Sequence, residues 1–319
     1  IGDNVHFEEE YQGEKGLLSL DYYVLRDHLE KEKTHFQEVP RMFEAFEHWF
    51  GTYPFYEDGF KLVEVPYLGM EHQSSITYGN QYENGYRGRD LSQTGWGLKF
   101  DFIIIHESGH EWFANNITYQ DIADMWIHES FTNYSESLFL DYHFGSEAGN
   151  AYVRGTRRNI VNDRPIIGIY GVNQSGSGDM YYKGGNMLHT IRQIVEDDDV
   201  FRSMLRSMNA EFYHQTVNTE QIEEFMSNFL EIDLSSVFDQ YLRDTDIPTL
   251  EYVIQDDQFN YRWINSVPHF DMPVHVFFGE DRQLIYPTTS WKSMPMQDSS
   301  AQDISVDPNY YIGSSEIQF

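Results

Sequence analysis

The chain has 319 residues, in which 21 lysines and arginines are outnumbered by 52 aspartates and glutamates, so its net charge is −31. Such an acidic surface repels phosphate backbones and anionic lipids, which argues against a protein that binds nucleic acids or membrane surfaces. Hydrophobic residues make up 40% of the chain and aromatic residues 16%. This composition excludes a disordered protein, and the length allows two or three domains.

Two further features restrict the class of protein. Cysteine is absent, so disulfides and cysteine chemistry are excluded, and no apolar run approaches the roughly 20 residues of a membrane-spanning helix. The first residue is Ile1 instead of methionine. We therefore expect a processed or excised piece of a longer protein, whose compartment the sequence leaves open.

The N-terminal part of the chain mixes helical and strand-like patterns. Residues 21–50 contain few helix breakers, and phenylalanines recur there at helical spacing, so we expect a helix that is divided at Pro40. A turn region follows at residues 51–59. Residues 61–66 then alternate in the manner of a strand, and residues 74–78 do so again.

Gly69, Met70 and Glu71 lie between these two expected strands. A strand at this place, with a glutamate at its rim, could form the edge of a substrate groove. From the spacing alone, the simpler interpretation of Glu71 is a solvated carboxylate at the end of a strand.

Residues 106–110 carry the motif H-E-x-x-H. In a helix, His106 and His110 lie on one face, and Glu107 lies about 100° around the helix, near enough to reach a water between them. The motif predicts two histidines that bind Zn²⁺ and a glutamate that acts as general base. No proline occurs in residues 100–116, so we expect an unbroken helix. Ordinary helices also carry this pattern, with two partly buried core histidines.

A third ligand strengthens the metal hypothesis. Eighteen residues separate His110 from Glu129, and the polar residues 115–121 suit a turn between two helices. A second helix over residues 122–143 can aim Glu129 at the same ion, giving one Zn²⁺ with net charge about +1 and an open fourth position. Glu136 shares that helix face and is our candidate for the acceptor that holds a ligand histidine by its other ring nitrogen. The alternative is an exposed helix carboxylate.

The remaining chain predicts further helices and then strands. The expected helices cover residues 147–161, 186–196, 200–212, 219–229 and 234–243, with a loop rich in glycine and serine at 168–179. From residue 249 onward, alternation replaces the helical period. We therefore predict an α+β protein with two domains. They are a mainly helical zinc domain with a small β-sheet edge at 1–248, and a small all-β, sandwich-like domain at 249–319.

Four motifs in this order resemble the aminopeptidase N family of zinc peptidases. Residues 106–118 and 124–131 resemble its zinc signature, residues 69–72 its G-x-M-E-N exopeptidase motif, and residues 181–184 its Y-E-K-G motif. Residues 237–248 are similar to the segment that closes its catalytic domain. The family belongs to the gluzincins, includes leukotriene hydrolase, and has a thermolysin-like catalytic domain.

The resemblance implies a zinc-dependent aminopeptidase that acts on peptides with a free N-terminus. It implies that the Tyr181 hydroxyl stabilises the charge developing on the scissile carbonyl oxygen. Glu71, together with Gly69 and Met70, would hold the α-ammonium group of the substrate. Glu107 would take the proton of the attacking water and pass it to the leaving amine.

Several positions depart from the family pattern, which could alter the preferred side chain. The departing residues are Leu68, His72, Ala114, His128 and Ser130. The β-rich domain that precedes the catalytic domain in the family is also missing, so we expect a fragment. Three alternatives stay open: a thermolysin-like endopeptidase, an epoxide hydrolase similar to leukotriene hydrolase, and a catalytically silent domain that binds peptides or serves as a scaffold.

Overall fold

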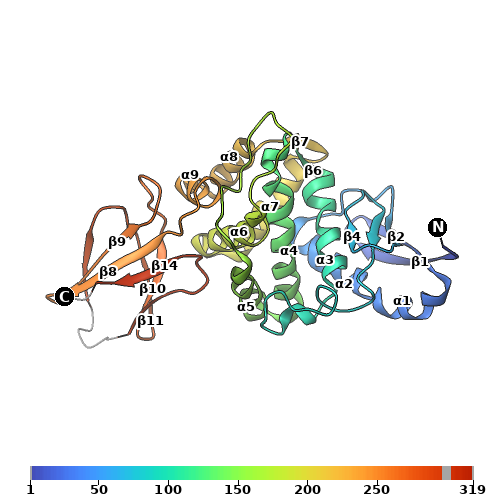
Figure 1. The fold of residues 1–319 in the computed structure, drawn as a ribbon, viewed down its shortest axis with the longest axis horizontal. Helices are drawn as coiled ribbons and strands as arrows, with labels where there is room; N and C mark the ends of the chain where they lie inside the picture. Colours follow the sequence, from blue (N-terminus) through green and yellow to red (C-terminus); the bar gives the residue numbers. More distant parts are fainter. Residues whose placement is uncertain (1, 297–302, 318–319) are drawn as a thin grey trace.

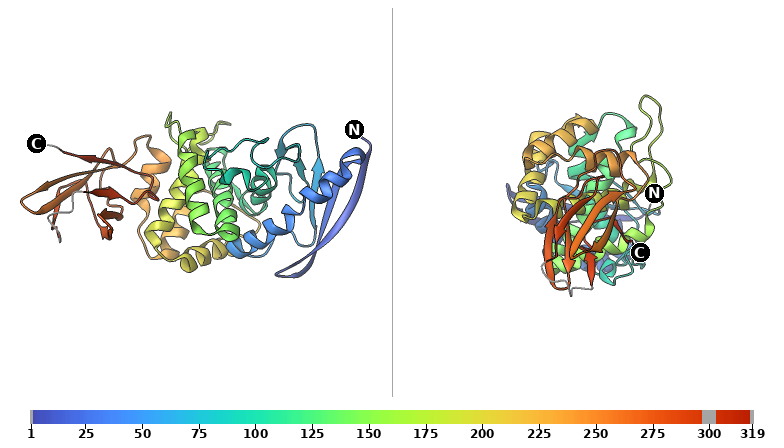
Figure 2. Two further views of the ribbon diagram at one scale, coloured as in Figure 1. Left: turned by 90° about the horizontal axis from the view of Figure 1, so that it is seen from below. Right: turned by 90° about the vertical axis from the view of Figure 1, so that its left-hand side faces the viewer.

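The computed structural model describes residues 2–296 and 303–317. It is an elongated molecule in which a sheet with two helices lies at one end, further helices fill the middle, and a second group of strands forms the other end (Figures 1 and 2). No helix within the described ranges has both the length and the hydropathy needed to cross a bilayer. The chain thus combines helices and sheets, as expected of an α+β protein.

The N-terminal sheet has five strands in the order β1-β2-β3-β5-β4. These strands are β1 (Asn4–Gly13), β2 (Gly16–Leu25), β3 (Phe60–Glu64), β4 (Gly69–Met70) and β5 (Ile76–Tyr78). The first two form an antiparallel hairpin, β3 and β5 add in parallel, and the short β4 runs antiparallel at the edge. The sheet is therefore larger than the small edge that the sequence predicted.

The expected helix over residues 21–50 is wrong at its N-terminal end. Residues 21–25 complete β2, whose alternate side chains are buried, and a 3-10 turn (Arg26–His28) follows. The helical part consists of α1 (Leu29–His35) and α2 (Glu38–Phe50), divided just before α2 and not at Pro40. Pro40 fits in the first turn of α2 because backbone N–H groups there have no partner within the helix.

The central helices pack around α4 (Trp126–Phe144), which contacts α2, α3 (Phe102–Gly109), α5 and α6 (Figure 1). Nearly all of α4 is buried, from its first residue to Leu140. The other helices are α5 (Ser146–Thr156), α6 (Tyr182–Val195), α7 (Asp198–Glu211), α8 (Thr219–Leu230) and the short α9 (Ser235–Phe238). A wider helical turn (Asp239–Arg243) continues α9.

Most of the expected helices are confirmed. Two of them, and the turn expected at residues 115–121, need correction. The helix over residues 100–116 is not unbroken, since α3 ends at Gly109 and a kinked turn (Glu111–Asn116) follows. The expected turn at residues 115–121 contains a strand, β6 (Ile117–Tyr119), that pairs in parallel with β7 (Gln215–Val217). Helix α6 also begins before the predicted residue 186. The pairing of β6 with β7 joins segments far apart in the chain, so no local sequence pattern predicts it.

Strands replace helices from Thr249 onward. They form one sheet in the order β12-β9-β8-β14 and another in the order β11-β10-β13. The strands are β8 (Thr249–Gln255), β9 (Gln258–Ile264), β10 (Val274–Phe278), β11 (Asp281–Ile285), β12 (Lys292–Pro295), β13 (Ile304–Val306) and β14 (Gly313–Glu316). An edge-on contact of 5.1 Å between the rings of Phe259 and Phe278 joins the two sheets.

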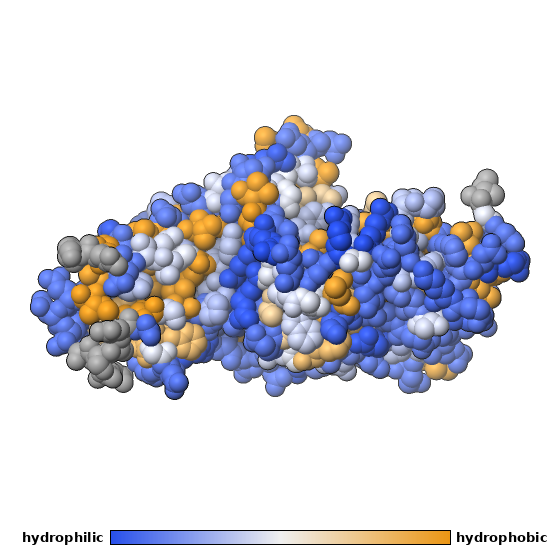
Figure 3. Space-filling model, turned by 60° about the horizontal axis from the view of Figure 1, so that its bottom comes forward, coloured by the Kyte–Doolittle hydropathy of each residue, from blue (hydrophilic) through white to orange (hydrophobic). Residues whose placement is uncertain are grey.

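The surface differs along the molecule. In one view, hydrophobic residues gather over the C-terminal strands, whereas the rest of that face is mostly hydrophilic (Figure 3). The division into two domains at residue 249 stays a prediction, and residues 297–302, 318 and 319 of the predicted second domain lie outside the described residues.

Candidate metal centre

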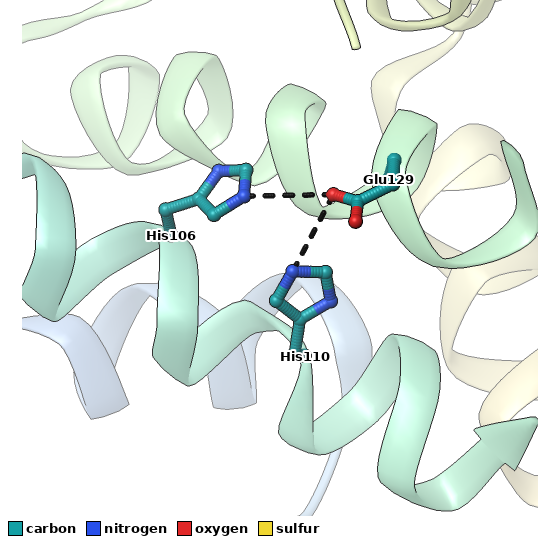
Figure 4. A group of neighbouring side chains, drawn as sticks. All are labelled: His106, His110 and Glu129. Atoms are coloured by element: carbon teal, nitrogen blue, oxygen red, sulfur yellow. Dashed lines mark ion pairs between the residues drawn. The ribbon is translucent and has the colours of Figure 1, made fainter. Parts of the chain in front are cut away.

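Helices α3 and α4 bring two histidines and a glutamate together. The Asp101 carboxylate caps α3 by accepting the first free N–H groups of the helix, at 2.9 and 3.2 Å. The Nε2 atoms of His106 and His110 lie 3.7 and 3.5 Å from Glu129 Oε2 (Figure 4). All three side chains are buried, and together they form a group that could hold a metal ion.

The other nitrogen of each ring is already engaged. His110 Nδ1 lies 3.1 Å from the carbonyl oxygen of Phe113, and because a carbonyl can only accept, Nδ1 carries the proton. His106 Nδ1 likewise donates to Glu136 Oε1 at 2.8 Å. Both Nε2 atoms therefore face Glu129, and each can offer a lone pair to a metal ion once it carries no proton. The kink after α3 is what turns the Phe113 carbonyl toward His110.

These contacts point both Nε2 atoms and Glu129 Oε2 at one place, where loss of the Nε2 protons would leave three lone pairs. Glu129 Oε2 is buried and has no hydrogen-bond partner. A buried carboxylate oxygen without a donor is costly, whereas a divalent cation would satisfy it and both imidazoles together. The donor set therefore fits Zn²⁺.

Glu136 is itself held firmly in the core. Its carboxylate accepts from Asn133 Nδ2 at 3.1 Å and from the Tyr152 hydroxyl at 2.5 Å, besides His106. The structure thus places Glu136 in contact with His106 and not on the surface. Carboxylates in this position orient a metal-binding imidazole and raise its basicity.

The charges at the centre favour an ionised ligand and a buried base. Burial on its own raises the pKa of Glu129, but the positive charge of protonated His110 and His106 outweighs it and lowers the pKa to about 2. Burial would lower the pKa of His106, but Glu129 and Glu136 outweigh it and raise that pKa well above its ordinary value. Burial also raises the pKa of Glu107 above its ordinary value, against the lowering effect of the two histidines. Glu107 thus lies beside the group as a carboxylate poised to take up a proton.

The edge strand β4 passes close to α3 at Gly69. A side chain there would come within 2.8 Å of Ile103 Cγ2 and 3.3 Å of Glu107 Cγ, so only glycine allows this approach. The neighbouring Met70 is exposed and Glu71 is partly buried. The negative charge of Glu71 is near enough to raise the pKa of Glu107 further, after burial.

Two contacts attach the loop after β4 to the kinked turn after α3. Asn115 Nδ2 donates to the Glu71 carbonyl at 2.8 Å, and the Ser74 N–H donates to Glu111 Oε1 at 2.7 Å. Neither contact, of Asn115 or of Glu111, was predicted from the sequence. Their role depends on the kink, and the only signal was that they closely follow the histidine motif.

Tyr181 lies at the start of α6 and borders the same centre. Its ring stacks on that of His106, with centroids 6.0 Å apart. Burial, and then the charge of Glu129, raise the pKa of Tyr181, so the hydroxyl stays protonated and able to donate. Ser130 on α4 donates to the carbonyl of Met180 at 2.7 Å and fixes this segment in place.

His128 departs from the family pattern but does not join the cluster. Burial lowers its pKa to about 3, so the ring is neutral. Its Nε2 accepts the N–H of Tyr119 at 3.0 Å, and the two rings stack at 4.2 Å. His128 therefore connects α4 to β6 instead of adding a charge to the centre.

Comparisons with known proteins identify the family that the chain matches. The model of the peptidase family M1 domain matches residues 34–241. Aminopeptidase N of Lactobacillus helveticus is 23% identical over 262 residues, which are 75% of this chain and 30% of the relative. Aminopeptidase N of Lactococcus lactis subsp. lactis is 23% identical over 226 residues, 65% of this chain and 25% of the relative. The chain thus spans about 30% of the length of the first of these relatives.

Two solved structures share the fold. The crystal structure of Legionella pneumophila aminopeptidase A in complex with aspartic acid superposes with a TM-score of 0.74 at 14% identity, covering 100% of this chain and 39% of that one. A mutant M1 zinc metallopeptidase from Deinococcus radiodurans, bound to a Tyr-Ser-Ala substrate, gives a TM-score of 0.60 at 18% identity. That match covers 77% of this chain and 53% of the other.

Proposed function

The chain belongs to peptidase family M1, and on this basis we propose that it is a zinc-dependent aminopeptidase that removes N-terminal residues from peptides. The observation that carries the proposal is the convergence of two imidazole Nε2 atoms and the unpartnered Glu129 carboxylate oxygen on one point. The names of the relatives, aminopeptidase N among them, support the same activity.

His106, His110 and Glu129 would hold one Zn²⁺ per chain, with Glu136 orienting His106. When bound, the ion would supply a Lewis acid that polarises the scissile carbonyl and lowers the pKa of a water. Two neutral imidazoles and one carboxylate leave the site with a net charge of about +1, the donor set of catalytic zinc sites.

Glu107 and Tyr181 would move and stabilise the charges of the reaction. Glu107 takes the proton of the attacking water and delivers it to the leaving amine, a task that suits a buried carboxylate with a raised pKa. The Tyr181 hydroxyl, kept protonated by its surroundings, donates to the oxygen on which negative charge develops.

Glu71, aided by Gly69 and Met70, would select substrates with a free N-terminus. Its carboxylate pairs with the α-ammonium group, while Asn115 holds its backbone carbonyl. A blocked N-terminus would leave this carboxylate desolvated without a partner, which costs free energy and disfavours such substrates. Exopeptidase selectivity follows from that penalty.

We propose the finer architecture as well. Residues 1–248 would form the thermolysin-like catalytic domain, and residues 249–319 a sandwich-like domain. The likeness to Legionella pneumophila aminopeptidase A over the full chain supports a shared fold at this level.

The test compares an aminoacyl-arylamide with an N-acetylated peptide, together with zinc content. We expect one Zn²⁺ that is lost when His106 is replaced by alanine, cleavage of the free substrate only, loss of activity with a chelator and its return with Zn²⁺. Equal cleavage of both substrates would identify an endopeptidase. A zinc-loaded chain that cleaves neither would be a peptide-binding or scaffold domain, and the proposal would then be wrong.

A further inference from the structure

A second group of metal-ligating side chains lies in the N-terminal part of the molecule. His28 ends the 3-10 turn before α1, Glu32 lies on α1, and Glu64 ends β3. Ligand atoms of the three residues all lie within 4.8 Å of one another. One imidazole and two carboxylates from three different elements thus meet at the place where α1 packs near the sheet.

All three residues already have hydrogen-bond partners. Glu64 Oε1 lies 2.6 Å from His28 Nδ1, and Glu64 Oε2 accepts the N–H of Leu25 at 2.6 Å. The Tyr82 hydroxyl donates to Glu32 Oε1. These bonds fix the carboxylates of Glu32 and Glu64 in place before any ion binds.

The remaining oxygen of Glu32 points to a missing ligand. The Glu32 side chain is fully buried, and its Oε2 has no hydrogen-bond partner. Burial raises the pKa of Glu32 to about 8, and the nearby Glu64 carboxylate adds to this effect. A buried carboxylate oxygen of this kind is satisfied in proteins by a donor or by a cation.

An ion has access to the group from solvent. A pocket of about 360 Å³ opens beside it and is lined by His28, Glu64, Tyr82, Lys31 and Arg87. The Lys31 ammonium is engaged elsewhere, donating to the Gln81 carbonyl at 3.0 Å and lying over the Tyr82 ring. The pocket therefore gives a cation a route to His28 and to the Glu64 carboxylate, while Glu32 is buried and does not line it.

We propose that His28, Glu32 and Glu64 bind a second divalent transition-metal ion, separate from the centre on α3 and α4. Nitrogen and carboxylate oxygen donors suit Zn²⁺ or Mn²⁺. Two carboxylates and a neutral imidazole cancel the charge of the ion, unlike the net charge of about +1 at the first centre. Such a neutral site joins α1 to β3 and has a structural role. It does not depend on the proposed peptidase activity.

The experiment counts bound Zn²⁺ per chain by mass spectrometry after saturation and extensive dialysis. We expect about two equivalents in the parent chain and about one in Glu32→Gln, with peptidase activity unchanged. His28→Gln, at a side chain that is 42% exposed, should give the same loss if Glu32→Gln folds poorly. Glu8→Gln, in the exposed group of His6, Glu8 and Asp21, is the matched control and should keep both ions.

His106→Ala separates this proposal from the first centre, because it should remove one equivalent while leaving the second. The proposal is overturned if Glu32→Gln and His28→Gln bind as much Zn²⁺ as the parent. It is also overturned if Glu8→Gln alone loses an equivalent. If Glu32→Gln and His28→Gln bind as much Zn²⁺ as the parent, Glu32 and Glu64 share a proton instead of binding an ion.

Discussion

The two halves of the molecule bury acidic side chains in different ways. Around α3 and α4, the carboxylate of Glu129 faces two imidazoles, and Glu136 accepts from three donors. Around the N-terminal sheet, and in the turn after α3 that contacts Ser74, burial raises the pKa of Glu32 to about 8, of Glu38 to about 7 and of Glu111 to about 8. Glu129 stays ionised at neutral pH, whereas the second group tends to be protonated.

The difference shows how the neighbours of a buried acid set its protonation state. Removing a carboxylate from water favours its neutral form unless opposite charges or donors face it. Glu129 has such neighbours, and its pKa falls to about 2. The glutamates near the sheet have few positively charged or donating neighbours. Each is therefore neutralised by a proton or, at Glu32, by the proposed cation.

The largest expected effect is at Glu107, the proposed general base on α3. Glu107→Gln keeps the shape and the metal ligands but cannot accept a proton. We expect the kcat for an aminoacyl-arylamide to fall by roughly 10²–10⁴-fold, with zinc content unchanged. Steady-state kinetics and metal analysis check this, with the exposed Glu57→Gln as control. Full activity in Glu107→Gln would remove it from the role of base.

A smaller loss is expected from Tyr181→Phe, which removes only the hydroxyl donor. The kcat should fall by about 10²–10³-fold while KM changes little, because the donor acts on charge that appears in the transition state. Tyr182→Phe, one residue further on, is the matched control and should retain activity. Equal losses in both variants would point to packing at the start of α6.

Glu136→Gln tests whether the carboxylate that contacts His106 supports metal binding. The amide would weaken the hold on His106 Nδ1, so Zn²⁺ affinity should fall by about 10–100-fold. Competition with a chromogenic chelator measures this, and Glu220→Gln, at an exposed helix carboxylate, is the control. Unchanged affinity would make Glu136 a core residue without influence on the ion.

The sequence predicted those parts of the site that depend on local spacing. Four-residue spacing indicated that His106 and His110 share a helix face, and seven-residue spacing indicated the same for Glu129 and Glu136. The structure brings all four together. Tyr181 is one of 23 tyrosines, and only the family resemblance selected it.

Features that depend on tertiary contacts escaped the sequence analysis. The backbone is kinked after α3, where the Phe113 carbonyl contacts His110. Helical periodicity in the sequence does not predict this contact. Buried and exposed side chains alternate along β2, where Leu18, Leu20, Tyr22 and Val24 are buried. Its partner β1, however, lies upstream of the segment that was predicted to be helical. The raised pKa values of the buried glutamates likewise follow from packing.

The smallest expected effect is on stability, at Glu111 in the second group. Its Oε1 accepts from Ser74, whereas its Oε2 is buried without a partner. Because the folded pKa of about 8 exceeds the ordinary value of 4.5, the folded state binds more protons between these pH values. The contribution of Glu111 to the free energy of unfolding therefore falls as pH rises through this window.

Glu111→Gln removes the pH-dependent contribution of this side chain to the free energy of unfolding, while it keeps an oxygen that can accept from the Ser74 N–H. In chelator-treated protein, urea unfolding should show a gain of roughly 1 kcal/mol over the parent at pH 8 and little difference at pH 5. The residual pH dependence should persist, since Glu32 and Glu38 titrate in the same window. Glu57→Gln, at an exposed position, should follow the parent at both pH values. If Glu111→Gln does so as well, Glu111 is ionised in the folded chain, and the contrast between the two groups of buried acids fails there.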